Sequence, residues 1–219
     1  MASRAALPAA RPPPYTASMV TIIDYGSGNL RSVQKALERI GVEALISDDP
    51  QRVAESERVV LPGVGAFDDA MRELRARGLV EPIVAHVQAD KPFFGICMGL
   101  QLLFETGWEG GENRGLGLLE GDVARFELPA GMKVPHMGWN TVTWGPAAGR
   151  FAQSPDDWYY FVHSYAARPR DPSVIAGVTD YGGEFCAAVA RGRLFATQFH
   201  PEKSQETGMR LLRAFVDRP

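Results

Sequence analysis

Hydrophobic positions in the first half of the chain form two kinds of pattern, short apolar runs and stripes that recur every three or four residues. The runs predict strands buried on both faces, which need no polar alternation, at residues 20–23, 42–46, 59–61 and 92–96. The stripes predict helices that follow the first and third runs and end at Gly41 and Gly78. Strands separated by helices of this length predict a parallel sheet with crossover helices, which is an α/β fold.

The second half of the chain has a different pattern. Residues 107–121 are rich in glycine and are expected to form a loop. Several β-rich runs follow with few helices between them, and they predict added antiparallel strands at 122–126, 139–142, 159–162, 174–178, 186–189 and 194–199. A last stripe at Met209, Leu212 and Phe215 predicts a helix that packs back on the sheet.

Composition and charge exclude several classes of protein. With 45% hydrophobic and 22% charged residues, the 219-residue chain has the composition of a globular domain. Lys and Arg number 23 against 26 Asp and Glu, so no basic field exists for nucleic acid. No apolar run approaches the roughly 20 residues of a membrane span. Two cysteines cannot form a disulfide framework and suit a reducing compartment, so we expect a cytoplasmic protein.

Residues 1–18 differ from the rest of the chain. They are rich in Ala and Pro and contain Arg4 and Arg11 but no acid. We expect a disordered tail rather than a transit peptide, because the segment lacks a good amphipathic helix. Met19 stands directly before the first strand, so an upstream start is a further interpretation. A single domain is expected over residues 19–219.

The segment from Gly95 to Gly99 carries the clearest chemical signal. A buried strand runs through Gly-Ile-Cys-Met-Gly into a predicted helix, which is the cysteine form of a nucleophile elbow. The two glycines allow a sharp turn, which lifts the Cys97 sulfur above the carboxyl edge of the sheet. The helix N-terminus favours a thiolate, and the backbone N–H of Met98 is placed to stabilise an oxyanion. A small buried cysteine is the alternative, but it leaves the paired glycines unexplained.

A second motif, His200-Pro201-Glu202, follows the last apolar strand. His200 can accept the thiol proton, while Glu202 can hold the other imidazole nitrogen. Cys97, His200 and Glu202 thus match the nucleophile, base and orienting group of a catalytic triad.

Other candidate groups are interpreted as structural. His163 lies on a predicted apolar strand, and His136 has no matching His or Cys cluster, so we expect no metal site. Cys186 stands among small apolar residues and is expected to be an inert buried thiol. Gly26 and Gly28 resemble half a phosphate loop but lack its remaining residues, so no nucleotide cofactor is expected.

The glycine-flanked Cys97, together with His200-Pro201-Glu202, resembles the class I (triad) glutamine amidotransferases. Further motifs resemble the glutaminase subunits of imidazole glycerol phosphate synthase, at residues 24–30, 61–67, 133–140 and 160–165. The resemblance runs from Met19 to the end of the chain. It implies a class I glutamine amidotransferase-like, flavodoxin-like open mixed sheet with parallel core strands, flanking helices and added antiparallel strands.

The resemblance implies glutamine as the small-molecule substrate. Glutamine would be hydrolysed to glutamate and ammonia through a cysteine thioester, with the triad residues in the roles given above and no cofactor. In the family, the turn at residues 62–65 is an oxyanion strand, so a backbone N–H near Val64 is expected to join that of Met98. Gly63 would present main-chain groups to the substrate, and Gln101 would contact it. A plain turn and an exposed helix glutamine are the alternatives.

The resemblance also implies a partner. Ammonia would pass to a (β/α)8-barrel cyclase, and the heterodimer would make imidazole glycerol phosphate and aminoimidazole carboxamide ribotide in histidine biosynthesis. The residues that match the family's interface are Asn29, Trp139, Tyr160 and Lys203. A core tryptophan is the alternative for Trp139.

Other functions remain open from the sequence. A glutaminase of anthranilate, aminodeoxychorismate or pyridoxal phosphate synthesis is one, which the motifs at 24–30 and 133–140 disfavour. A different Cys-His-Glu hydrolase, such as a cysteine peptidase, is disfavoured by Gln101 and the turn at 62–65. A non-catalytic module on the same fold is a third, and the intact triad argues against it.

Overall fold

The computed structural model describes residues 19–217, so the tail expected over 1–18 lies outside the described residues. Within these residues, a parallel core has the strand order β2-β1-β3-β4-β14. Its members are β1 (Val20–Ile23), β2 (Ala44–Ser47), β3 (Val59–Gly63), β4 (Phe93–Cys97) and β14 (Leu194–Thr197). Each overlaps a predicted apolar run, because a strand covered on both faces is apolar nearly throughout. The antiparallel direction expected for the run at 194–199 is wrong, since β14 is fully buried and pairs parallel to β4.

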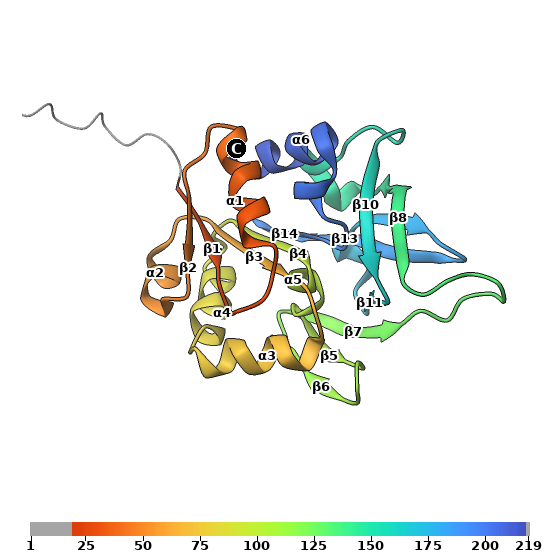
Figure 1. Cartoon of the computed structure of the whole chain (residues 1–219), viewed down its shortest axis with the longest axis horizontal. Coiled ribbons are helices and arrows are strands. Elements are labelled where there is room, and N and C mark those ends of the chain that lie inside the picture. Colours follow the sequence, from red (N-terminus) through yellow and green to blue (C-terminus); the bar gives the residue numbers. More distant parts are fainter. Residues whose placement is uncertain (1–18, 218–219) are drawn as a thin grey trace, which may run out of the picture.

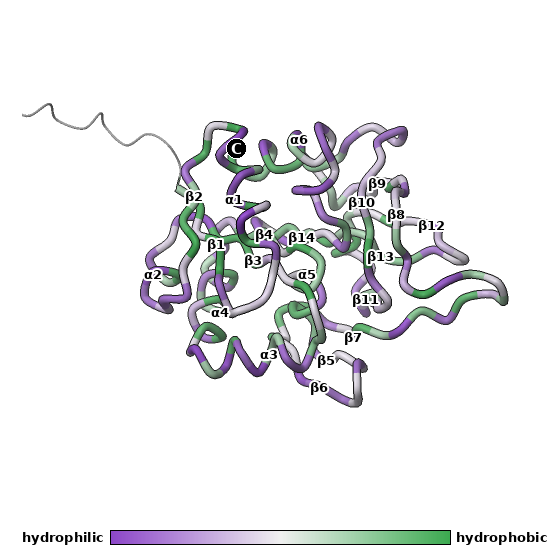
Figure 2. Tube along the Cα trace, in the orientation of Figure 1, coloured by the Kyte–Doolittle hydropathy of each residue, from purple (hydrophilic) through white to green (hydrophobic). Residues whose placement is uncertain are grey.

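Helices cover both faces of this core (Figure 1). One face carries α1 (Leu30–Arg39) and α6 (Gln205–Val216), and the other carries α2 (Pro50–Glu55), α3 (Phe67–Ala76), α4 (Val80–Gln88) and α5 (Met98–Gln101). Apolar residues follow the central strands and polar residues the outer helix faces, as Figure 2 shows. No helix between residues 19 and 217 is long and apolar enough to cross a membrane.

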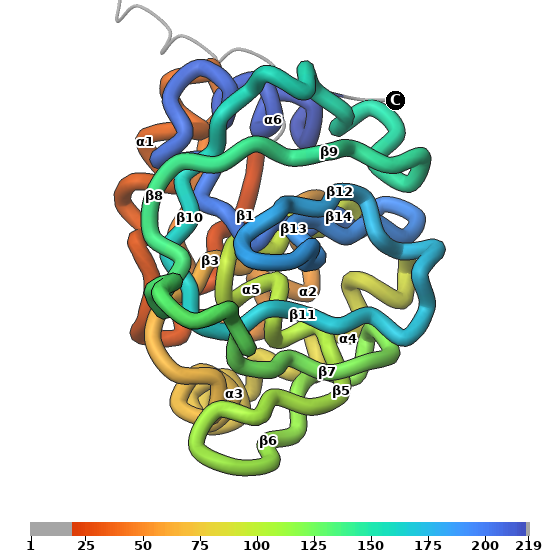
Figure 3. Tube along the Cα trace, turned by 90° about the vertical axis from the view of Figure 1, so that its right-hand side faces the viewer, coloured from red at the N-terminus to blue at the C-terminus, as the bar shows by residue number. Residues whose placement is uncertain are grey.

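Antiparallel strands extend the sheet beyond β14, as predicted for the second half (Figure 3). They continue through β13 (Glu184–Arg191), β11 (Tyr165–Pro169) and β7 (Leu119–Arg125) to β5 (Phe104–Gly107) and β6 (Asn113–Arg114), with β5 parallel to β7. Two further strands, β12 (Ile175–Asp180) and β9 (Thr143–Trp144), pair beside β13.

A separate antiparallel ribbon consists of β8 (His136–Thr141) and β10 (Trp158–His163). Its register places Trp139 opposite Tyr160 and His136 opposite His163. The backbone N–H of His200 donates to the carbonyl oxygen of Tyr160 at 2.9 Å. The ribbon is therefore bonded directly to the segment that follows β14.

Most of the elements that the prediction missed are short. The helices α2 and α4 and the strands β5, β6, β9 and β11 were not predicted, and the loop expected over 107–121 is wrong in part. α2 buries a single hydrophobic residue, Val53, so its sequence shows no helical period. A Cβ at Gly107 would lie 2.6 Å from the Phe67 ring, and one at Gly115 would overlap the carbonyl oxygen of Phe104. The glycines here permit close packing between elements rather than mark a loop.

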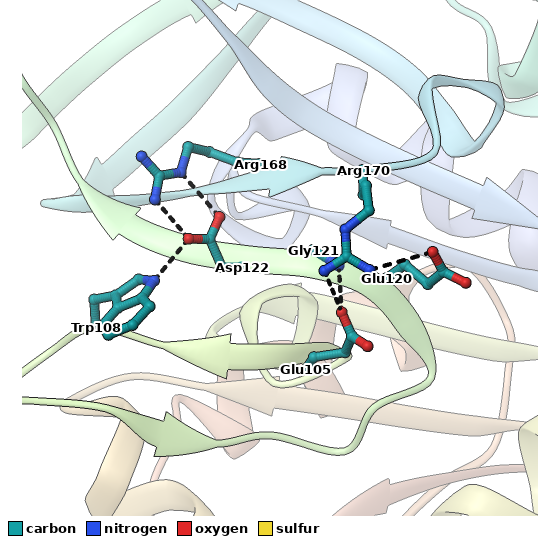
Figure 4. Close-up of polar contacts among 7 residues, drawn as sticks. All are labelled: Glu105, Trp108, Glu120, Gly121, Asp122, Arg168 and Arg170. Atoms are coloured by element: carbon teal, nitrogen blue, oxygen red, sulfur yellow. Dashed lines mark hydrogen bonds and ion pairs between the residues drawn. The ribbon is translucent and has the colours of Figure 1, made fainter.

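Charged side chains join the outer strands β5, β7 and β11 (Figure 4). Arg168 on β11 donates to both carboxylate oxygens of Asp122 on β7, and Trp108 Nε1 donates to Asp122 Oδ2 at 2.6 Å. Arg170 contacts Glu105 at 3.1 Å and Glu120 at 3.4 Å. The Arg168 guanidinium beside Asp122 holds the pKa of that carboxyl below its usual range.

Candidate active site

Cys97 stands at a sharp turn between β4 and α5. Its backbone has φ 54° and ψ −104°, a region that non-glycine residues rarely adopt outside functional sites. A Cβ at Gly95 would lie 2.7 Å from the carbonyl oxygen of Gly99, and one at Gly99 would overlap that of Leu61. The glycines on both sides of Cys97 are thus required by the turn, as the sequence predicted.

His200 reaches the same edge of the sheet from the neighbouring strand. β14 lies parallel to β4, with Thr197 opposite Ile96, so both strands end side by side. His200 follows three residues later, and its Nδ1 lies 2.8 Å from Glu202 Oε1. Both side chains are buried, at 2% and 1% exposure. The structure therefore contains the expected contact between His200 and Glu202.

Cys97 and Glu202 determine the charge of the His200 ring. The imidazole Nε2 is buried, makes no well-formed hydrogen bond with any residue between 19 and 217, and interacts with Cys97. Burial by itself lowers the pKa of His200, but the charge and hydrogen bonding of Cys97 and of Glu202 outweigh it and raise the pKa to about 10. The His200 ring therefore carries a proton near neutral pH and lies beside the Cys97 sulfur.

The main chain of His200 is fixed by β10. Its N–H donates to the Tyr160 carbonyl oxygen, while its own carbonyl accepts from Ser204 Oγ at 2.6 Å. Ser204 Oγ in turn accepts from the Tyr160 N–H at 3.0 Å. These contacts form a small ring of hydrogen bonds between β10 and His200, and Ser204 within it is buried.

A cavity of about 330 Å³ opens above the Cys97 elbow. Cys97, Val64, Met98, Gln101 and His200 all line it. The volume lies at the small end of the range for ligand pockets, so the cavity suits a molecule of amino-acid size. The structure thus brings together most of the residues that the sequence assigned to catalysis and substrate binding.

Gly63 lies behind this cavity rather than in its wall. It is paired in register with Cys97, and a Cβ there would lie 2.7 Å from the Met98 Cβ and overlap the Tyr25 hydroxyl. The next residue, Val64, accepts a hydrogen bond from Ser27 Oγ to its carbonyl oxygen at 2.7 Å. This contact holds the turn at 62–65 against the segment that precedes α1.

Gln198 is a residue of the site to which the sequence analysis gave no role. Its Nε2 lies 3.6 Å from the Cys97 sulfur, and its Oε1 accepts from Gln101 Nε2 at 3.1 Å. Gln101 Nε2 also donates to the Tyr165 carbonyl oxygen at 3.0 Å. The only sequence signal for Gln198 is its place between the last core strand and His200.

A pair of buried histidines connects β8 to the cavity wall. His163 Nδ1 donates to the Tyr165 carbonyl oxygen at 2.9 Å, so its Nε2 is the acceptor that faces His136 Nδ1 at 3.3 Å. Burial lowers the pKa of His136 to about 4 and that of His163 to about 3. His163 is hydrogen-bonded, as the sequence suggested, but it also lines the cavity.

Three of the four predicted interface residues lie together on the surface. The ring centroids of Trp139 and Tyr160 lie 5.9 Å apart, and Lys203 Nζ lies 5.8 Å from the centre of the Tyr160 ring. Trp139 is 43% exposed, so it is not a core tryptophan. Asn29 immediately precedes α1, which packs against the turn η3 (Pro201–Lys203).

The structure provides no metal centre among the described residues. Between residues 19 and 217, no group of three or more His, Cys, Asp or Glu side chains is arranged to hold an ion. Cys186 lies in β13 and is only 4% exposed, and this burial raises the pKa of its thiol to about 12. It lies outside the cavity wall and remains a neutral thiol.

A family model described as glutamine amidotransferase class-I matches residues 21–218, so the chain belongs to that family. It is 59% identical over 201 residues to the imidazole glycerol phosphate synthase subunit HisH of Rhodopirellula baltica, covering 92% of this chain and 98% of that relative. It is 52% identical to the subunit of the same name from Syntrophotalea carbinolica, covering 91% and 100%. Within the family, the chain therefore falls in the group of HisH subunits.

Solved structures share the fold at much lower identity. A crystal structure titled as a glutamine amidotransferase superposes with a TM-score of 0.70 at 22% identity, covering 90% of this chain and 96% of that one. The structure of PurLQS from Thermotoga maritima gives a TM-score of 0.71 at 18% identity, covering 92% and 98%. These likenesses confirm the predicted class I glutamine amidotransferase-like mixed sheet.

Proposed function

We propose that the chain is the glutaminase subunit of an imidazole glycerol phosphate synthase and hydrolyses glutamine at Cys97. The observation that carries this is the strained Cys97 turn, whose sulfur faces a cavity beside the buried His200–Glu202 pair. Relatives at up to 59% identity bear the name of that synthase subunit. The motifs that disfavoured other amidotransferase pathways point the same way, and no observation supports a peptidase or a non-catalytic module.

The proposed reaction begins with attack of the Cys97 thiolate on the side-chain amide carbon of glutamine. A carbon–sulfur bond forms, the negative charge moves to the amide oxygen, and the carbon–nitrogen bond then breaks. His200 gives its Nε2 proton to the departing nitrogen, which leaves as ammonia. Water attacks the γ-glutamyl thioester with His200 as base, and glutamate leaves as the thiolate re-forms.

The remaining cavity residues have supporting roles in this proposal. The N–H of Met98, at the start of α5, donates to the oxyanion, and the N–H of Val64 is the second donor. Gln101 has its Nε2 occupied by Tyr165 and Gln198, which leaves its carbonyl oxygen to accept from the substrate. Gly63 lets the turn at 62–65 pack closely against Met98 and Tyr25, which keeps Val64 in the cavity wall.

The ammonia is proposed to pass to a (β/α)8-barrel cyclase in a heterodimer that works in the cytoplasm. That partner would use it to make imidazole glycerol phosphate and aminoimidazole carboxamide ribotide. The exposed group of Trp139, Tyr160 and Lys203, with Asn29 nearby, is the proposed docking face. Its support is that Tyr160 is bonded through its backbone to His200, so contact there reaches the site.

Glutamate release by the purified chain tests this function, measured alone and with candidate barrel subunits. Wild type should release glutamate, most rapidly with the correct subunit, and Cys97→Ala should not. Cys186→Ala removes the other thiol, which lies outside the cavity, and should retain the activity. Release by Cys97→Ala at the wild-type rate would contradict the proposal.

A further inference from the structure

Gln198 bridges the proposed nucleophile and the proposed substrate-binding glutamine. Its side chain is fully buried, with Nε2 3.6 Å from the Cys97 sulfur and Oε1 3.1 Å from Gln101 Nε2. Its backbone N–H donates to the Ala187 carbonyl oxygen of β13 at 2.8 Å. The main chain and both ends of the side chain are therefore held in place.

The Tyr165 carbonyl group determines the orientation of the side-chain amides of Gln101 and Gln198. The Tyr165 carbonyl oxygen can only accept, so the Gln101 atom that lies 3.0 Å from it must be the nitrogen. The same nitrogen faces Gln198, so the facing atom of Gln198 must be its oxygen. The other end of that side chain is then a donor, and this end faces the Cys97 sulfur.

We propose that Gln198 is a positioning residue for the Cys97 nucleophile, which it holds by donating an N–H to the thiolate. The inference rests on the proposed function of Cys97. A hydrogen bond to a charged acceptor is stronger than one to a neutral acceptor, so this contact favours the thiolate over the thiol. The amide carries no proton that titrates near neutral pH, so it does not compete with His200 as a base.

The bridge acts on both ends of the proposed reaction. In the free site it holds the sulfur in place beside the imidazolium. In the thioester the Cys97 sulfur carries no charge, so the hydrogen bond from Gln198 weakens. That hydrogen bond strengthens again when water displaces Cys97 as a thiolate. Gln198 would thus stabilise the thiolate both as nucleophile and as leaving group, while Gln101 keeps the amide in the correct orientation.

The test is the pH dependence of Cys97 alkylation by iodoacetamide, followed by mass spectrometry of the Cys97 peptide. Gln198→Met keeps a similar volume but cannot donate, and Gln198→Asn keeps the amide on a shorter side chain. Thr197→Val is the matched control, because this buried hydroxyl one residue away donates to the Phe199 carbonyl oxygen and not to sulfur. Circular dichroism establishes that each variant is folded.

In the Gln198 variants, the pH of half-maximal alkylation should rise by about one unit, which is about a tenfold loss of thiolate below that pH. The Thr197→Val midpoint should match wild type. A Gln198→Met alkylation midpoint equal to that of wild type overturns the inference. If the Met variant does not fold, a Gln198→Asn midpoint equal to that of wild type overturns it instead. Glutamate release by wild type with its barrel subunit is measured in parallel. Absence of release overturns the proposed function, whereas normal release with equal midpoints overturns only the role of Gln198.

Discussion

At the scale of single residues, the site depends on buried polar groups that have few partners. His200 lies between Cys97 and Glu202, and no other residue makes a side-chain hydrogen bond to its ring within the described part of the chain. The pKa of His200 is raised to about 10, so the ring carries a proton near neutral pH. Removing the charge of Glu202 should therefore weaken the imidazolium form without changing the cavity, whose wall does not include Glu202.

Glu202→Gln tests this pairing. The amide oxygen can still accept from His200 Nδ1, but the negative charge that favours the imidazolium is lost. We expect kcat for glutamate release to fall by about 10²-fold or more, with KM nearly unchanged. Glu206→Gln, on the exposed side of α6, serves as the control and should behave like wild type. A Glu202→Gln kcat within twofold of the control would contradict the assigned role.

The buried pair of His136 and His163 predicts a pH dependence of stability. Burial holds both pKa values at about 4 and about 3, whereas an unfolded histidine titrates near 6.5. As pH falls below about 6.5, the unfolded chain binds protons that the folded chain does not, so the free energy of unfolding decreases.

The expected contribution of each histidine is about 1.4 kcal/mol per pH unit between roughly pH 6 and pH 4. Urea unfolding at a series of pH values measures the slope for wild type and for His163→Asn. The variant should be less stable at pH 7, because His136 loses its acceptor, and its slope should be smaller by about one histidine's contribution. An equal pH dependence of the free energy of unfolding in wild type and His163→Asn would contradict the idea that His163 stays neutral in the fold.

At the scale of elements, the sequence predicted the core strands and the site residues that lie at or just beyond their ends. Strands β4 and β14 are apolar runs, with Cys97 at the end of β4 and His200 three residues beyond β14, so the meeting of Cys97 with His200 followed from the pattern. The parallel direction of β14 did not follow, because its run lies among β-rich runs that few helices separate. Elements such as α2 and β6 are too short to show a period. Gln198 was missed because its role depends on the distant Gln101 and Tyr165, which the sequence does not place beside it.

The outer strands provide a prediction at this scale. Arg168→Ala removes the contacts that join β11 to Asp122 on β7. The Arg168 side chain is 60% exposed, so the free energy of unfolding should fall by only about 0.5–1 kcal/mol at low salt. Denaturant unfolding should show the loss shrinking at high salt, and also as pH falls far enough to protonate Asp122. Equal stabilities at low salt and neutral pH would show that the pair contributes nothing.

At the scale of the whole molecule, the proposed docking face and the cavity share one structural unit. The ribbon of β8 and β10 presents Trp139 and Tyr160 outward, and the backbone of Tyr160 is bonded to His200 on its inner side. Ser204 completes the ring of hydrogen bonds. A partner that displaced this ribbon would move the main chain of the histidine, which gives docking a direct route to the site.

Lys203→Glu tests the docking face. The substitution places a negative charge over the Tyr160 ring, where the cation now lies. We expect association with the barrel subunit to weaken by about tenfold, and more at low than at high salt. Lys91→Glu is the control, because Lys91 precedes β4 at the opposite end of the core strands from Lys203. Equal dissociation constants for Lys203→Glu and wild type, from titration calorimetry, would contradict the assignment of this face.

The nucleophilic role of Cys97 is tested most directly by labelling with an electrophilic glutamine analogue, followed by peptide mass spectrometry in the presence of the barrel subunit. We expect one adduct on the Cys97 peptide, which excess glutamine prevents, and none on Cys186. An adduct that forms equally on both cysteines, or labelling of Cys97 that glutamine does not slow, would contradict this role.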